Sequence, residues 1–129
     1  MEFNLFLCKK CLNVVDVFGK ADTMLKCCSE HMTKLEPNTV DAAKEKHIPF
    51  VSINDNTLTI SVGEIIHPMN SEHFIKCVYI LDDIGNMQKI SFKSTDKPKV
   101  TVTINQNAKK VKVYSYCNLH GLWLKEIEL

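Results

Sequence analysis

The feature that most constrains this chain is a crowd of cysteines at its N-terminal end. Four of the six cysteines lie within the first 28 residues: Cys8, Cys11, Cys27 and Cys28. The first two have the C-x2-C spacing of a metal knuckle, and the adjacent second pair fits a shared metal better than the geometry of a disulfide. So short a segment has too few large apolar side chains for a core, and it needs a bound metal or a disulfide to fold. The sequence therefore predicts a tetrahedral four-thiolate site for zinc or iron.

The balance of the composition excludes several classes of protein. The chain has 129 residues and a formal net charge of +1, which is too small an excess of lysine and arginine for nucleic-acid binding. It has no apolar run near the ~20 residues that span a bilayer, and residues 1–8 lack the basic start of a signal peptide. We expect a cytoplasmic protein that binds neither nucleic acid nor membrane. In a reducing compartment, six cysteines and five histidines indicate metal or redox chemistry rather than disulfides.

The chain divides at Pro37 into a metal-binding domain, residues 1–36, and a second domain, residues 37–129. In the second domain the hydrophobic pattern has a period of two, with turn residues between the runs. The expected strands are Thr57–Val62, Phe74–Leu81, Gln88–Lys93, Lys99–Ile104 and Lys110–Val113. This pattern predicts a mainly β chain folded as a β-sandwich. One short helix is expected at about residues 39–46, with Asn38 or Thr39 as its N-cap.

A second cluster of metal-binding residue types falls in loops or at the ends of these strands: His47, His67, His73, Cys117 and His120. A single histidine is more often an ordinary polar residue than a ligand. Five such residues at positions where a rigid scaffold presents functional groups predict a second metal site. We interpret His31 as a surface residue and Cys77 as a small buried hydrophobe.

Two other classes of function stay open on these residues alone. A zinc ribbon attached to a sandwich could serve as a protein-interaction module, although the second cluster would then be a coincidence. A pure electron carrier with coordinatively saturated irons is the other alternative. A metal analysis with an optical spectrum separates them, because ferric thiolate centres absorb visible light and zinc sites are colourless.

Both clusters resemble the desulfoferrodoxin, or superoxide reductase, family. The N-terminal cysteines are similar to those of desulforedoxin, a small domain with a rubredoxin-like iron centre, except that Leu12 stands where that family usually has glycine. The second part resembles the catalytic domain over four stretches: Glu45-Lys46-His47-Ile48-Pro49, Gly63-Glu64-Ile65-Ile66-His67-Pro68-Met69, Glu72-His73 and Cys117-Asn118-Leu119-His120-Gly121-Leu122-Trp123. With the cysteines, the resemblance covers nearly the whole chain.

The resemblance implies a desulforedoxin-like domain followed by an immunoglobulin-like, seven-stranded antiparallel β-sandwich, in a homodimer. It implies two mononuclear irons, one rubredoxin-like in the four cysteines. The other is catalytic, with His47, His67, His73 and His120 equatorial and Cys117 axial. Superoxide would bind the open sixth position and be reduced to hydrogen peroxide, with electrons from rubredoxin or a similar donor.

Two charged residues beside a predicted ligand receive roles from the same resemblance. Lys46 would attract superoxide and organise protonation, and Glu45 would become the sixth ligand of ferric iron. On the residues alone, a solvated charge pair at the end of a short helix is the favoured interpretation, and only the neighbouring ligands favour a function.

Overall fold

The computed structural model describes residues 3–20 and 24–129. The chain forms two compact units, residues 1–36 and residues 37–129. Within the described ranges, no helix has the length and apolar character that crossing a membrane requires.

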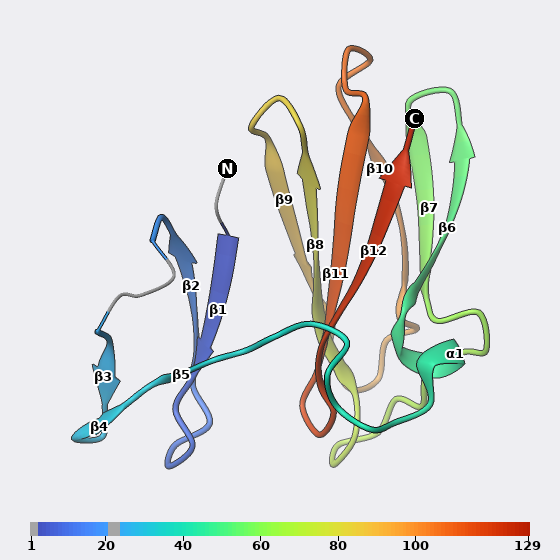
Figure 1. The fold of residues 1–129 in the computed structure, drawn as a ribbon. Helices are drawn as coiled ribbons and strands as arrows, with labels where there is room; N and C mark the ends of the chain where they lie inside the picture. The colour runs from blue at the N-terminus through green and yellow to red at the C-terminus, as the bar shows by residue number, and fades with distance from the viewer. Residues whose placement is uncertain (1–2, 21–23) are drawn as a thin grey trace. The chain divides into compact units, whose positions relative to one another are not determined.

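Within its described residues, the first unit consists of five short strands, β1 to β5 (Figure 1). Strands β1 (Phe3–Leu7), β2 (Val14–Phe18) and β5 (Thr33–Lys34) form an antiparallel sheet in the order β2-β1-β5. Strands β3 (Lys26–Cys27) and β4 (Glu30–His31) form a separate pair. His31 is exposed, as predicted. The turn after β1 carries Cys8 and Cys11, whereas Cys27 ends β3 and Cys28 begins the turn after it.

The second unit contains two antiparallel sheets. The smaller sheet has the order β10-β7-β6, formed by β6 (Pro49–Asn54), β7 (Thr57–Val62) and β10 (Lys99–Thr103). The larger sheet has the order β12-β11-β8-β9, formed by β8 (Ile75–Asp82), β9 (Met87–Ser91), β11 (Lys110–Cys117) and β12 (Gly121–Glu128). The predicted mainly β fold is confirmed.

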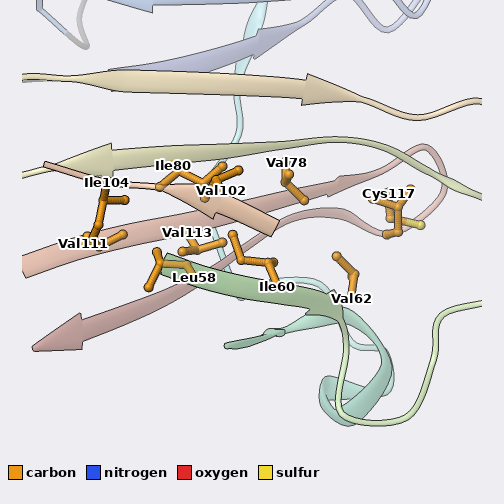
Figure 2. Close-up of a cluster of buried hydrophobic side chains, with 11 residues drawn as sticks. Leu58, Ile60, Val62, Val78, Ile80, Val102, Ile104, Val111, Val113 and Cys117 are labelled. Carbon is orange, nitrogen blue, oxygen red and sulfur yellow. The ribbon is translucent and has the colours of Figure 1, made fainter. Parts of the chain in front are cut away.

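The core lies between these sheets and follows from the period of two. Leu58, Ile60 and Val62 alternate along β7 with partly exposed residues and are fully buried. Figure 2 shows them among side chains of the larger sheet, with Cys117 at one end of the cluster. Burying an aliphatic side chain of this size stabilises the fold by about 1.5–3 kcal/mol. The core is thus built from apolar side chains of both sheets and carries Cys117 at its edge.

The helix differs from its prediction. Helix α1 spans only Lys44–His47 and begins after Ala43, which makes no side-chain cap bond. Asn38 caps nothing, because its amide binds the backbone N–H and carbonyl of Leu124 at 2.9 and 3.2 Å. Its backbone has a φ of 62°, outside the range of a helix. The segment that leads to α1 is therefore fixed to β12 instead of being helical.

Candidate metal centres

The four N-terminal cysteine sulfurs come together, all within 4.8 Å of one another. The Sγ atoms of Cys11 and Cys27 are 3.6 Å apart, and those of Cys27 and Cys28 are 3.9 Å apart. Four thiolates about 2.3 Å from one ion at tetrahedral corners would have sulfurs about 3.8 Å apart. The observed spacing fits a single tetrahedral metal.

Left-handed backbone conformations produce this arrangement. Cys28 and Ser29 have φ values of 52° and 62°, which supply the bend that lets adjacent cysteines face one ion. Leu12 has a φ of 64°, and its N–H donates to the Cys8 carbonyl at 2.8 Å. This conformation costs roughly 1–2 kcal/mol for leucine, whereas glycine adopts it freely. The departure at Leu12 therefore keeps the knuckle turn and loses no cysteine from the cluster.

The pKa values of neighbouring thiols in this cluster are shifted in different directions. The backbone N–H of Cys11 is the largest influence on Cys8, and it helps to lower the pKa of that thiol to about 7. Hydrogen bonding to Cys11 and Cys8 raises the pKa of Cys27 to about 12. Without a cation, Cys27 is therefore protonated at neutral pH, and a metal must displace that proton to bind the thiolate.

The second cluster is a square of four imidazoles. The ring centroids of His47 and His67 and those of His67 and His73 are 4.6 Å apart. Those of His73 and His120 and those of His120 and His47 are 4.9 Å apart. His47 and His73 lie across the diagonal at 6.3 Å. One nitrogen of each ring and the sulfur of Cys117 all lie within 4.8 Å of one another.

The orientation of two of these rings is fixed by backbone carbonyls. The Nδ1 atoms of His47 and His67 lie 2.7 Å from the carbonyl oxygens of Ala43 and Pro68. Each Nδ1 must donate there, so each Nε2 is an unprotonated lone pair. These two Nε2 atoms are 3.1 Å apart, and the Nε2 of His47 is also 3.1 Å from the Nδ1 of His120. Facing lone pairs at this distance repel unless a cation lies between them.

The donor set passes further tests for a metal. Two nitrogens about 2.1 Å from one ion and at right angles would lie about 3.0 Å apart, close to the spacing found. The Nε2 of His73 is buried without a hydrogen-bond partner among the described residues, as expected of a ligand. The Sγ of Cys117 is 3.4 Å from the Nε2 of His67 and 3.9 Å from the Nδ1 of His120. Those two rings occupy opposite corners, so the sulfur lies over the square.

Burial favours the neutral form of His47, His67 and His73, which is the form that binds a metal. It lowers the pKa of His67 to about 4 and also lowers the pKa values of His47 and His73. Burial raises the pKa of the Cys117 thiol, so its ionisation depends on a nearby positive charge. These three imidazoles can therefore bind a cation without losing a proton, whereas the Cys117 thiol ionises only beside a positive charge.

Two buried side chains hold His47 in place, and neither was predicted to have a role. The hydroxyl of Ser115 is fully buried on β11 and donates to the carbonyl of His47 at 2.7 Å. The indole of Trp123 stacks on the His47 ring, and its N–H donates to the carbonyl of His120 at 3.1 Å. A polar residue inside an apolar strand pattern was the only sequence signal for Ser115.

The segment with Glu45 and Lys46 packs directly on the loop before His67. The N–H of Ile65 donates to the carbonyl of Glu45 at 2.9 Å. A Cβ at Gly63 would lie 2.6 Å from that carbonyl oxygen, so no side chain fits there without moving α1. Both charged side chains are exposed, and the charge of Lys46 contributes to the lowered pKa of His47. Cys77 is buried on β8 and lies outside both clusters, as predicted.

Comparison with known proteins gives a consistent result. A family model described as desulfoferrodoxin matches residues 39–126. The desulfoferrodoxin of Syntrophotalea carbinolica is 35% identical over 125 residues, which is 97% of each chain. The superoxide reductase of Pyrococcus abyssi is 35% identical over 101 residues, covering 66% of this chain and 88% of its own.

A solved structure extends the likeness to the fold. The superoxide reductase from Treponema pallidum is 31% identical, with a TM-score of 0.80 over 97% of this chain and 99% of that one. The four-cysteine cluster and the square of imidazoles with its thiolate are the two iron sites typical of desulfoferrodoxins. The sequence match, the fold and these two sites together establish that the chain belongs to the desulfoferrodoxin family.

Proposed function

We propose that this protein is a superoxide reductase. Each superoxide would take up one electron and two protons and leave as hydrogen peroxide, with no dioxygen formed. The observation that carries the proposal is the square of four imidazoles with the sulfur of Cys117 over it. Five donors leave one position of an octahedral ion for a small anion. This position also argues against a pure electron carrier, whose metal would be coordinatively saturated.

The proposed ligands of the catalytic iron are His47, His67, His73, His120 and Cys117. Iron held there would supply the electron, and the donating thiolate would favour its transfer. The carbonyls of Ala43 and Pro68 support this assignment, because they fix two of the rings with a lone pair toward the centre. They would hold these two rings in the orientation that binds a metal.

Lys46 is proposed to attract superoxide and to organise the delivery of protons. Its charge already affects the neighbouring His47, and its side chain is exposed to solvent, the source of the protons. Glu45 is proposed to offer its carboxylate at the sixth position after turnover. The close packing of Gly63 against the Glu45 carbonyl supports a fixed backbone from which both side chains reach.

The N-terminal unit is proposed to be a separate iron-binding domain, residues 1–36, with Cys8, Cys11, Cys27 and Cys28 as ligands. Residues 37–129 would then form the catalytic domain. The tetrahedral sulfur spacing supports a rubredoxin-like centre. From family membership we further propose a cytoplasmic homodimer that receives electrons from rubredoxin or a similar donor.

A stopped-flow experiment tests the proposal. The prereduced protein is mixed with pulses of superoxide, and iron content, hydrogen peroxide and dioxygen are measured. One peroxide per superoxide with no dioxygen supports a reductase. A dismutase gives only half as much peroxide, together with dioxygen. Zinc in both sites and no reaction would leave a non-catalytic module.

A further inference from the structure

The amide of Asn118 joins two parts of the catalytic site that are distant in sequence. Asn118 lies in the turn after β11, next to Cys117. Its Nδ2 donates to the carbonyl of Glu72 at 2.8 Å, and its Oδ1 accepts from the N–H of Phe74 at 2.9 Å. Its own N–H donates to the carbonyl of Phe74 at 3.2 Å. These three bonds bracket His73 on both sides.

His73 depends on such support more than His47 and His67 do. The rings of His47 and His67 each bind a carbonyl through Nδ1, whereas the structure supports His73 through its backbone. The Oδ1 of Asn70 accepts from the N–H of His73 at 2.9 Å, but that bond only closes the loop on itself. Among the hydrogen bonds of the described residues, those to Asn118 connect the loop to the turn that carries Cys117 and His120.

The backbone pairing of the sheet does not connect the His73 loop to the turn after β11. The ladder between β8 and β11 shifts register between Tyr116 and Cys117, and it ends where Cys117 pairs with Ile75. His73 lies beyond that end. The side chain of Asn118 continues the connection past the last strand pair, as backbone bonds would have done in a longer strand.

We propose that Asn118 is a positioning residue that sets His73 against Cys117 and His120. This inference rests on the proposed metal site. It adds that the fourth imidazole reaches its corner of the square through the backbone of its loop, which the Asn118 amide holds. Loss of that amide should loosen one ligand and leave the other donors and the fold in place.

Asn38 provides a matched control within the same unit. Its side chain also makes two bonds to one strand, with the N–H and carbonyl of Leu124, and its own N–H donates to the carbonyl of Leu122 at 3.0 Å. That strand includes Trp123. It is nevertheless paired with β11 from end to end, so it keeps its position when the Asn38 bonds are lost. Helix α1, with His47, also keeps the bonds from the Ile65 N–H to the Glu45 carbonyl and from the Ser115 hydroxyl to the His47 carbonyl.

The first test compares Asn118→Ala with Asn38→Ala in the iron-loaded protein. An excess of an iron(II) chelator such as bipyridine removes the metal, and the rate of loss from the second site is followed optically. Because supporting residues of a metal site change affinity by about tenfold to hundredfold, Asn118→Ala should release iron at least about tenfold faster and Asn38→Ala less than about twofold faster. Equal acceleration in the two variants overturns the proposal.

The second test needs no metal and no activity. In the metal-free protein, labelled imidazoles are observed by nuclear magnetic resonance. Asn118→Ala should broaden or average the signals of His73 and leave those of His47 and His67 unchanged. Unchanged His73 signals, or equal changes in all the rings, refute the proposal. If Asn118→Ala does not fold, Asn118→Asp serves instead, because it keeps the acceptor for Phe74 and loses the donor to Glu72.

These tests remain distinct from those of the proposed function. A wild-type protein that binds iron but does not reduce superoxide would end the reductase assignment, while the chelator and resonance experiments still report on Asn118. A wild-type reductase with no special sensitivity at Asn118 would end only the positioning role.

Discussion

The indole of Trp123 lies on the imidazole of His47, with ring centroids 5.0 Å apart and an angle of 29° between the planes. Trp123 is fully buried, and its N–H also binds the carbonyl of His120. One side chain therefore contacts two neighbouring corners of the imidazole square. The hydrophobic core and the metal site meet at this residue.

Replacing Trp123 should affect both stability and the metal. Trp123→Phe keeps a ring against His47 but leaves the His120 carbonyl without its donor, and we expect a loss of about 2 kcal/mol in unfolding free energy. Release of the second iron should accelerate. Urea unfolding followed by circular dichroism and chelator kinetics measure the two effects. Ile80→Ala is the control, since it truncates the core away from the ligands and should lower stability alone.

The two metal sites should be separable, because they share no ligands and belong to different units. Cys27→Ser should remove the N-terminal iron and leave superoxide reduction by prereduced protein near the wild-type rate. Iron analysis and stopped-flow kinetics provide the measurement. A stable variant that retained its second iron but lost the chemical step would make the N-terminal metal more than an accessory.

Cys117→Ser should abolish most of the reductase activity. Serine offers an oxygen but lacks the soft, donating thiolate, so the visible sulfur-to-iron band of the second site should disappear. Cys77→Ser is a matched control, because Cys77 is also buried but lies outside both clusters. A wild-type spectrum and turnover in Cys117→Ser would remove this residue from the ligand set.

Lys46→Ala should slow the capture of superoxide without changing iron content or the visible spectrum. The net charge of +1 cannot steer an anion globally, so the advantage is local. One charge about 4 Å from another is worth about 1 kcal/mol in water and several-fold more in a partly dry site, which corresponds to about fivefold or more in rate.

The dependence on salt separates this role from a general effect on the fold. Salt should slow wild-type capture and have less influence on the Lys46→Ala variant, because mobile ions screen exposed charges. Glu45→Ala should not slow capture, since it removes a negative charge. Equal rates for Lys46→Ala and wild type at low salt would make Lys46 an ordinary surface lysine.

The metal-free catalytic unit should lose stability in mild acid. In the unfolded chain His67 binds a proton near its ordinary pKa of 6.5, but in the folded chain only near about 4. Between these values the unfolded state binds more protons, so stability is complete above pH 6.5 and falls as the pH drops toward 4. The single tryptophan, Trp123, reports urea unfolding of this unit by fluorescence. A His67→Gln variant should show a flatter pH dependence, and an unchanged slope would contradict the assignment.

Part of the fold could be predicted from the sequence because one face of each strand is buried. The run Thr57–Val62 coincides with β7 for this reason. Strand β12 escaped prediction, because Leu122, Trp123 and Leu124 are consecutive apolar residues that break the alternation. Strand β6 begins at a proline and exposes Phe50 and Ile53, so it too has no clear period of two.

The candidate site shows a similar division. Motifs and residue types were enough to group the five donor residues of the second cluster. They could not indicate which nitrogen of each ring faces the centre, because the carbonyls of Ala43 and Pro68 decide this only after folding. Asn118 lies within one of the stretches that resemble the family, but no role was predicted for it, since an asparagine in a turn is an ordinary choice.

The buried core of the sandwich has a consequence for which metal ion each of the two sites binds. The larger unit has a buried core that packs the strands bearing its ligands, so its donor geometry is set largely by the fold. Its geometry can therefore reject an ion with the wrong coordination preference. The 36-residue unit must instead fold around whichever thiophilic ion arrives, so its occupant reflects supply. When iron is scarce, the same molecule should carry zinc in its cysteine cluster long before its histidine site is mismetallated.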